Sequence, residues 1–244
     1  MSTKVLSVGG SIIAPNSCDV EFLAGFSKMA SQWLEENPDS RLILVAGGGA
    51  PARVYQNAYR DVAAKFDEKQ KAVCGFKDEE ATNYACDWLG IMATCLNAQV
   101  LKTCFGPLCP QDVVTDPTSV NEFKGRVLVA AGWKPGFSTD NDAVLLAEKF
   151  NADTVVNLSN IEKVYTDDPR KNPDAKPIDT ISWVEFRKMV GDEWVPGKNC
   201  PFDPIASKKA QELKLTVICA AGKNIENIRS ILDGKDYIGS TIKD

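Results

Sequence analysis

Three glycine clusters offer backbone amides suited to holding an anion. They are Gly9-Gly10-Ser11, Gly47-Gly48-Gly49 and the segment 132–136, which leads into Ser138-Thr139-Asp140, and each follows an apolar, β-branched run. Glycine at the end of a strand lets N–H groups approach an anion, and a following helix N-terminus adds partial positive charge. None of the clusters fits GxxxxGK[ST] or GxGxxG, so each alone predicts only a tight turn. At one edge of one parallel sheet, the three together favour a polyphosphate or phosphoryl ligand.

Three aspartates are candidates for chemistry beside such an anion. Asp140 and Asp203 precede the helical runs AVLLAEKF and PIASKKAQEL, and Pro204 after Asp203 is a strong helix-start signal. A carboxylate in a phosphate crevice could instead hold Mg²⁺ or orient lysines around a transferred phosphoryl group. Asp87 lies in the apolar helical run DWLGIMAT, where a lone acid is usually on the solvated face. From the residues alone, helix caps and a solvated acid are the favoured interpretations.

Composition excludes several classes of protein. The 244 residues contain no histidine, which excludes Ser-His-Asp and Cys-His hydrolases and every imidazole metal site. Lys and Arg number 28 against 33 Asp and Glu, for a net charge of -5, so the sequence indicates no nucleic-acid partner. The eight cysteines form no CxxC pair, which argues against zinc and dithiol redox sites. Small molecules are therefore the expected substrates.

Short apolar runs alternate with longer helical patterns, which predicts the elements that position these groups. A helix is expected over 20–34, with Asp19 as its N-cap. Strands are expected at 4–8, 41–46, 98–101, 127–131, 154–158 and 215–219. These runs are apolar rather than alternating, as in strands covered on both faces. The sequence predicts an α/β fold in which helices cover a largely parallel sheet shared by both halves, with a surface loop at 167–177.

The N-terminus MSTKVLSVGGS lacks a basic segment followed by a long apolar run. No stretch of the chain reaches the roughly 18 consecutive apolar residues of a membrane span. We therefore expect a cytoplasmic protein with no membrane partner.

The order of motifs resembles that of the amino acid kinase superfamily. VGGS, VAGGGAPAR, DWLGIMAT, GFSTDNDAVLLAE, LSNIEKVYTDDPRKNPDAKP, FDPIASKKA and GSTI follow one another from about Lys4 to Ile242. Within it, the chain is most similar to hexameric microbial uridylate (UMP) kinases of the archaeal type. The resemblance implies a three-layer α/β/α sandwich forming one domain over 1–244, with an acceptor-nucleotide half at 1–150 and an ATP-binding half at 151–244. It also implies Mg²⁺ as cofactor and a homohexamer.

The resemblance also implies a role for individual positions. The implied ATP-binding residues are Gly9, Gly10, Gly49, Arg53, Ser159, Asn160, Tyr165 and Asp168. The implied UMP-binding residues are Gly48, Asp87, Lys134, Pro135, Gly136, Phe137, Ser138, Thr139 and Asp140. Asp203, Asp140 and Arg53 take the catalytic roles. On this basis Asp87 binds the acceptor ribose rather than solvent.

The chain departs from the family pattern at three positions. Ser7 stands where many members carry a lysine two residues before the first glycine, and Lys163 replaces a glycine in IEKVYTDDP. Trp133 stands where a small residue or a threonine is expected near the uracil. We expect another cation to replace the lysine, with Arg53 as first candidate and Lys163 as second.

Three functions are consistent with these residues. The first is transfer of the γ-phosphoryl group of Mg-ATP to UMP, giving UDP in pyrimidine nucleotide biosynthesis. The second is a related kinase with another phosphate or carboxylate acceptor, because FSTDNDAV has features of glutamate and aspartate kinases, although DWLGIMAT argues against them. The third is a catalytically weak nucleotide- or oxyanion-binding protein on the same fold, suggested by Ser7 and Trp133.

Overall fold

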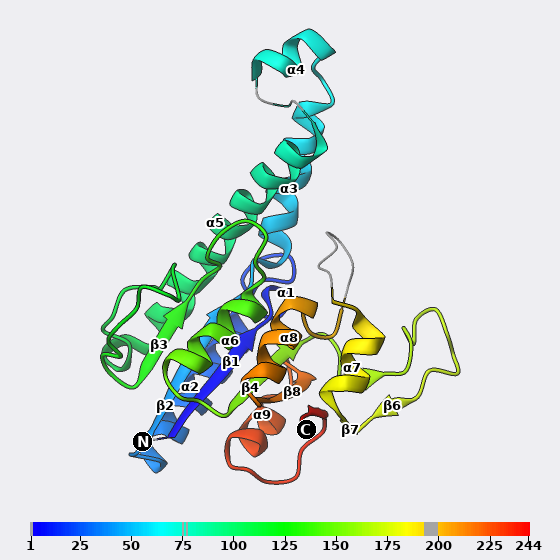
Figure 1. The fold of residues 1–244 in the computed structure, drawn as a ribbon. Helices are drawn as coiled ribbons and strands as arrows, with labels where there is room; N and C mark the ends of the chain where they lie inside the picture. The colour runs from blue at the N-terminus through cyan, green and yellow to red at the C-terminus, as the bar shows by residue number, and fades with distance from the viewer. Residues whose placement is uncertain (1, 75, 77, 193–199) are drawn as a thin grey trace.

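A seven-stranded sheet in the order β3-β2-β1-β4-β8-β9-β7 forms the centre of the protein (Figure 1). The computed structural model describes residues 2–74, 76, 78–192 and 200–244. The strands are β1 (Ser2–Val8), β2 (Ser40–Ala46), β3 (Val127–Ala130), β4 (Thr154–Ser159), β7 (Thr180–Ile181), β8 (Thr216–Ala221) and β9 (Ser240–Ile242). The first five strands in spatial order are parallel, and β9 runs antiparallel to β8.

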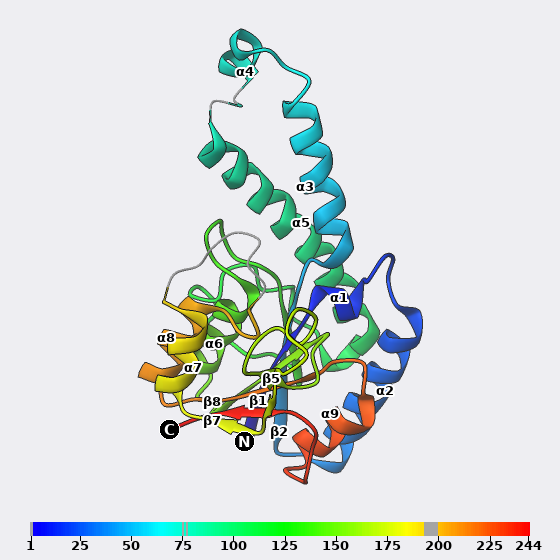
Figure 2. The same cartoon turned by 90° about the vertical axis from the view of Figure 1, so that its right-hand side faces the viewer.

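Helices cover both faces of the sheet because successive strand residues point to opposite faces and almost all are apolar. On one face, Leu6 and Leu44 pack with α2 (Val20–Glu36), α9 (Ile225–Leu232) and the second half of α5 (Glu79–Phe105). On the other face, Val5 and Ile43 pack with α6 (Thr139–Lys149), α7 (Trp183–Val190) and α8 (Pro204–Glu212). Figure 2 shows the two layers on opposite sides of the strands. The predicted α/β/α sandwich is confirmed.

The chain reverses its direction of travel across the sheet between β1 and β4. From β1 it moves outward through β2 to β3, then returns to place β4 and β8 on the other side of β1. Such a switch point opens a crevice at the carboxyl ends of the strands, where α/β proteins bind ligands. Gly9 N donates to Leu158 O at 2.8 Å across this point. The first glycine cluster therefore lies at the switch.

A helical arm extends away from the sheet (Figures 1 and 2). It consists of α3 (Gly49–Ala63), α4 (Glu68–Cys74) and the first half of α5. Smaller elements complete the described chain: α1 (Gly10–Ile13), the 3-10 turn Gly106–Leu108, and a hairpin of β5 (Val164–Tyr165) and β6 (Pro177–Ile178). The loop predicted at 167–177 connects β5 and β6, with Pro177 already in β6.

One predicted strand is wrong. Residues 98–101 lie inside the 27-residue helix α5. Ala98, Leu101 and Phe105 are buried at helical spacing and continue a face that starts at Ile91 and Thr94. A short apolar run looks the same in a buried strand and a buried helix, and here the helical period extends well beyond it on both sides.

The other predictions of secondary structure hold. The remaining five strands match β1, β2, β3, β4 and β8 within three residues at each end. Asp19 caps α2 by accepting a hydrogen bond from Phe22 N at 2.9 Å. Within the described residues, every helix is too short or too polar to cross a membrane.

Candidate active site

The first two glycine loops pack directly against each other, backbone to backbone. A Cβ atom on Gly10 would lie 1.9 Å from Gly49 N, and one on Gly47 would lie 2.4 Å from Gly10 N. Gly49 also has a φ of 67°, a left-handed conformation that side chains disfavour. Side chains are therefore excluded at this glycine junction, defined here as Gly10, Gly47 and Gly49. It presents main-chain groups at the carboxyl edge of the sheet.

Helix α5 fixes the second and third glycine loops. Buried Asn97 donates from Nδ2 to Gly47 O at 2.8 Å and to Gly48 O at 3.1 Å. Buried Thr94 accepts a hydrogen bond from Gly132 N at 2.8 Å. The sequence analysis missed both residues. Their signal is a polar side chain on the core-facing side of an otherwise apolar helix.

Asp140 is not a helix cap. Ser138 caps α6 by accepting from Asn141 N, and Asp140 lies in the first turn with its carboxylate toward the sheet. There it accepts hydrogen bonds from Ser7 Oγ at 2.8 Å and from Asp203 N at 3.3 Å. Asn157 Nδ2 lies 3.4 Å from the same carboxylate. Ser7 and Asn157, each a polar residue in an apolar strand, thus connect β1 and β4 to the acid.

Asp203 is a helix cap, as its position before Pro204 predicts. Its carboxylate caps α8 by accepting from Ala206 N at 2.8 Å, with Pro204 at the start of the helix. Its own backbone N–H donates to Asp140, which places the two acids side by side. The residue is 7% exposed, so this cap lies at the switch point rather than on the surface.

Burial controls the acidity of this edge. Burial raises the pKa of the Asp140 carboxyl to about 6; the Ser7 hydrogen bond opposes the shift and the charge of Asp203 adds to it.

Within the described ranges, no group of three or more His, Cys, Asp or Glu side chains could hold a metal ion. Asp140 and Asp203 nevertheless supply hard oxygen atoms that fit an Mg²⁺ ion bound mainly by phosphates.

A hollow of about 290 Å³ opens beside the glycine junction. Seven of its lining residues come from the predicted nucleotide sites: Gly48, Gly49, Arg53, Asp87, Lys134, Phe137 and Thr139. Gly132 of the third glycine cluster also lines it. Arg53 is exposed at the start of α3, and its guanidinium makes no hydrogen bond or ion pair within the described residues. A free guanidinium beside backbone amides is suited to bind phosphate oxygens.

Asp87 is half-buried and faces this hollow, so it is not on a solvated face. Its Oδ2 accepts a hydrogen bond from Gly136 N at 3.0 Å. The bond ties the first half of α5 to the third glycine loop, across the mouth of the hollow. Its carboxylate is therefore placed to accept bonds from a ligand hydroxyl.

Trp133 does not line the hollow. Its ring packs 5.1 Å from that of Phe137, and Lys134 Nζ lies 3.8 Å from the centre of the Trp133 ring. Phe137 and Lys134 do line it. Trp133 therefore supports the two residues that would face an acceptor base.

On the donor side, charged residues pair with residues of the β5–β6 hairpin and the segments beside it. Lys163 pairs with Asp179, and this partner raises the pKa of the Lys163 amine. Asp168 accepts from Arg170 Nε at 3.1 Å, which lowers the pKa of its carboxyl. Ser159 ends β4, Asn160 is exposed just after it, and Tyr165 lies in β5. Lys163 is therefore a weaker replacement for the missing lysine than Arg53.

Comparison with known proteins identifies the relatives. The sequence pattern of the amino acid kinase family matches residues 2–221. The chain belongs to the amino acid kinase family. It is 32% identical over 243 residues to a uridylate kinase of Pyrococcus abyssi, covering 98% of both chains. It is 34% identical over 236 residues to one of Methanosarcina barkeri, covering 94% of this chain and 91% of that one.

Solved structures of the family agree with the fold. The crystal structure of uridylate kinase from Archaeoglobus fulgidus superposes with a TM-score of 0.78 at 30% identity, covering 99% of this chain and all of that one. A UMP kinase of Bacillus anthracis has a TM-score of 0.70 at 16% identity, which shows the shared fold alone. The predicted similarity to archaeal members of the amino acid kinase family is confirmed.

Proposed function

We propose that this chain is a uridylate kinase that transfers the γ-phosphoryl group of ATP to UMP. The observation that carries this proposal is the hollow where Asp87, Arg53 and the second glycine loop meet. It combines a carboxylate that can accept hydrogen bonds from a ribose with N–H groups that can donate hydrogen bonds to a phosphate. Full-length similarity to uridylate kinases of several archaea supports it. UMP would lie in the hollow and ATP at the carboxyl ends of β4 and β8.

The proposed mechanism relies on positioning and charge. An oxygen of the UMP phosphate attacks the γ-phosphorus of ATP while the bond to the β-phosphate oxygen breaks, giving UDP and ADP. The acceptor phosphate is already ionised, so no general base is needed, in keeping with a chain that has no histidine. Main-chain amides of the glycine loops and the Arg53 guanidinium stabilise charge on the transferred group. Asp203 and Asp140 organise the centre of the site.

Magnesium is the expected cofactor. When bound, it would neutralise charge on the β- and γ-phosphate oxygens of ATP. Asp140 and Asp203 are the residues that would hold it, because the backbone N–H of Asp203 binds the Asp140 carboxylate and so places the two residues next to each other at the switch point. In the same proposal, residues 1–150 supply the acceptor half of the single domain and 151–244 the ATP half, and the reaction takes place in the cytoplasm.

An acceptor panel tests the function. ADP release is measured with ATP and Mg²⁺ in the presence of UMP, CMP, N-acetylglutamate, aspartate or carbamate. We expect UMP to give the highest kcat/KM and no UMP-dependent rate without Mg²⁺. A preference for a carboxylate acceptor would favour a related kinase, and binding of UMP without turnover would favour a nucleotide-binding protein.

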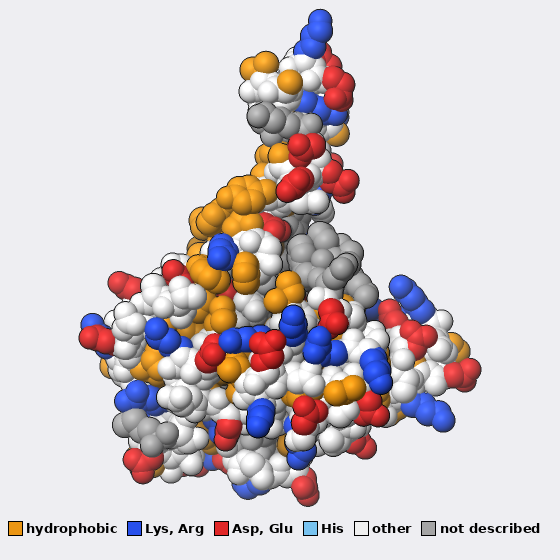
Figure 3. All heavy atoms as spheres, viewed as in Figure 1, with side chains coloured by type: hydrophobic (Ala, Val, Ile, Leu, Met, Phe, Trp, Pro, Cys, Tyr) orange, Lys and Arg blue, Asp and Glu red, His pale blue; other side chains and the backbone are white. Residues whose placement is uncertain are grey.

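The arm carries the surface through which we propose that copies of the chain associate. Tyr84, Trp88, Met92 and Leu96 recur every four residues along α5 and are each at least 40% exposed. Figure 3 shows hydrophobic side chains gathered along the arm. Apolar stripes of this kind usually mark protein interfaces. We infer that a second copy covers this stripe in the proposed homohexamer.

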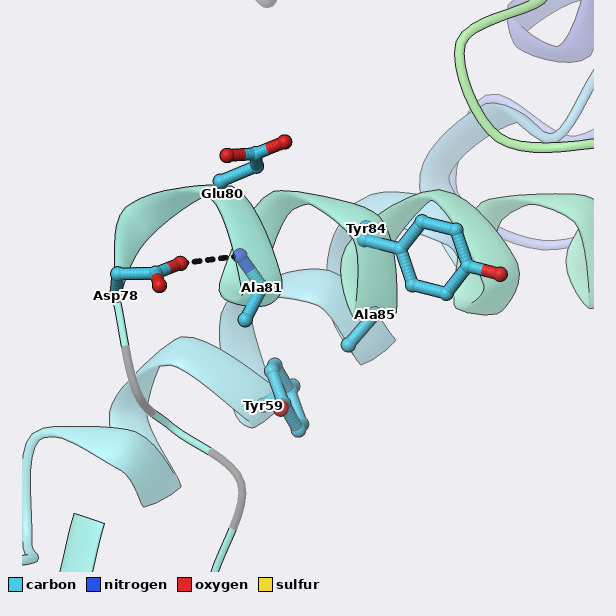
Figure 4. Close-up of a pocket in the computed structure, with 6 residues that line it drawn as sticks. All are labelled: Tyr59, Asp78, Glu80, Ala81, Tyr84 and Ala85. Carbon is cyan, nitrogen blue, oxygen red and sulfur yellow. Dashed lines mark hydrogen bonds between the residues drawn. The ribbon is translucent and has the colours of Figure 1, made fainter. Parts of the chain in front are cut away.

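The hollow at the arm tip does not resemble a nucleotide site. It has a volume of about 510 Å³ and is lined by Tyr59, Asp78, Glu80, Ala81, Tyr84 and Ala85 (Figure 4). Asp78 caps α5, and with Glu80 it gives the rim negative charge. A phosphate would be repelled there.

Light scattering coupled to gel filtration tests the interface. We expect Trp88→Glu to reduce the molar mass in solution and Val184→Glu, a matched change at an exposed position on α7, to leave it unchanged. An unchanged mass for both variants would remove the stripe from the interface.

A further inference from the structure

Asp142 is a buried acid with no role in the proposed chemistry. It lies in the first turns of α6 and is 0% exposed. Its Oδ2 accepts a hydrogen bond from Trp133 N at 3.1 Å. Its Oδ1 is buried and has no hydrogen-bond partner among the described residues. Burying an ionisable side chain in such surroundings costs folding stability. Its presence therefore points to a role other than stabilising the fold.

The charges near Asp142 do not explain its presence. Burial raises the pKa of its carboxyl to about 7, the Trp133 N–H lowers it, and the charges of Asp140, Asp116 and Asp203 raise it further. All three neighbouring charges are negative. The one contact that favours the carboxylate is therefore the Trp133 N–H.

That contact lies at the base of the third glycine loop. Residues 132–137 are tied to the rest of the protein at Gly132 by Thr94, at Trp133 by Asp142 and at Gly136 by Asp87. Asp87 faces the hollow and must share its oxygens with a ligand, whereas Asp142 is fully buried behind the loop. The Asp142 bond thus remains available when a ligand is bound.

The consequence reaches the hollow through stacked side chains. The hydrogen bond to Trp133 N fixes the backbone at the start of this segment. The Trp133 ring packs against the ring of Phe137, and the Lys134 amine lies over it. Phe137 N also donates to Lys134 O at 3.2 Å, so the segment closes on itself. Phe137 and Lys134 then line the hollow as one unit.

We propose that Asp142 is a positioning residue for the acceptor, which holds the Trp133-Lys134-Phe137 cluster over the nucleoside monophosphate. This role rests on the proposed function. It assigns the buried acid to acceptor recognition and leaves donor binding independent of it, since the carboxylate of Asp142 binds the main chain of the third loop.

Two measurements test the proposal with Asp142→Val and Asp142→Asn. The first is amide hydrogen exchange of residues 132–137 without nucleotide. The second is the Kd for UMP by calorimetry, together with KM values for UMP and ATP. Glu148→Gln is the matched control, because it removes an acid of the same helix that pairs with Lys209 outside the loop.

We expect Asp142→Val to speed exchange of the segment and to raise the Kd and KM for UMP by about tenfold or more, with the KM for ATP nearly unchanged. Asp142→Asn keeps an oxygen for Trp133 N and should restore most of the affinity. Glu148→Gln should behave as the wild type.

Normal exchange and normal UMP affinity in Asp142→Val would overturn the proposal. So would equal losses for UMP and ATP, which would indicate a merely structural role. If the wild type binds no UMP, the proposed function fails and acceptor positioning fails with it, while the exchange result still decides whether Asp142 anchors the loop.

Discussion

The acceptor side and the donor side of the site are built in different ways. On the acceptor side, Thr94, Asn97 and Asp142 are buried and bind main-chain groups of the glycine loops, which lie 38, 50 and 9 residues away in sequence, respectively. On the donor side, Lys163 and Asp168 pair with residues of the same region at the surface. Buried hydrogen bonds of this kind stabilise the folded state more than exposed ion pairs do. The loops of the acceptor side are therefore fixed by buried hydrogen bonds, whereas the charged residues around β5 and β6 are held by ion pairs at the surface. In the proposed function, ATP would compete with those ion pairs.

The glycine junction should show the largest effect. Gly10→Ala would place a Cβ 1.9 Å from Gly49 N, so backbone must move. We expect loss of measurable turnover and about 3 kcal/mol or more of stability, measured by ADP release and urea unfolding.

Gly234→Ala is the control, because Gly234 has a φ of 67° but a Cβ atom added there would meet nothing within 4 Å. It should cost about 1 kcal/mol and leave turnover intact. Equal effects of the two variants would contradict the close packing of the glycine junction.

The two candidate cations come next. Arg53 is unpaired within the described residues and lines the hollow, whereas Lys163 is held by Asp179. Arg53→Ala should lower kcat about ten- to a hundredfold, because it removes charge-assisted bonds from the transferred group. Lys163→Ala should change kcat less than about threefold. Steady-state kinetics of both variants measure these changes. A larger loss of kcat for Lys163→Ala than for Arg53→Ala would mean that the paired cation, rather than the unpaired one, serves the reaction.

Asp87 separates acceptor from donor binding. Asp87→Asn removes a charged acceptor from the hollow but keeps an oxygen for Gly136 N. The KM for UMP should rise about tenfold or more, with the KM for ATP nearly constant. Parallel changes in both constants would show that the loop tie, not ligand binding, is its function.

The smallest effect concerns stability against pH. Asp140 and Asp142 have folded-state pKa values of about 6 and about 7, above the unfolded value of 3.8. The folded state thus keeps protons that the unfolded chain releases, and this stability is present at low pH and lost as pH rises through 6 and 7. Without nucleotide, the melting temperature should fall by several degrees between pH 5 and pH 8.

The chain has no histidine, so few other side chains titrate in that window. Asp142→Asn should flatten the fall and raise the melting temperature at the alkaline end. A melting temperature that rises from pH 5 to pH 8 would contradict the raised pKa values.

Sequence reasoning found the sheet and the loops because both have local signatures. Apolar β-branched runs predicted five of the seven strands of the main sheet, and glycine clusters predicted the ligand edge. It failed at 98–101 because a short apolar run carries no period of its own. The short strands β7 and β9 gave no signal, since two or three residues are paired only by tertiary context.

The site was predicted in part. Seven of the positions implied by family resemblance line the hollow, but the residues that hold the glycine loops do not follow from local pattern. Thr94 and Asn97 act on loops 38 and 50 residues away in sequence. Asp140 shows the same limit of local sequence patterns. A helix cap binds main-chain groups of its own first turn, whereas Asp140 binds Ser7, which lies 133 residues away in sequence.

The length of α5 joins two tasks in one rigid body. Its exposed face carries the apolar stripe from Tyr84 to Leu96, and its buried face holds the glycine loops through Thr94 and Asn97. Twenty-seven residues of α-helix make a rod about 40 Å long. Tilting such a rod by about 3° around its midpoint moves each end by about 1 Å. The orientation of this one axis therefore sets both the position of the apolar stripe and the position of the glycine loops that Thr94 and Asn97 hold.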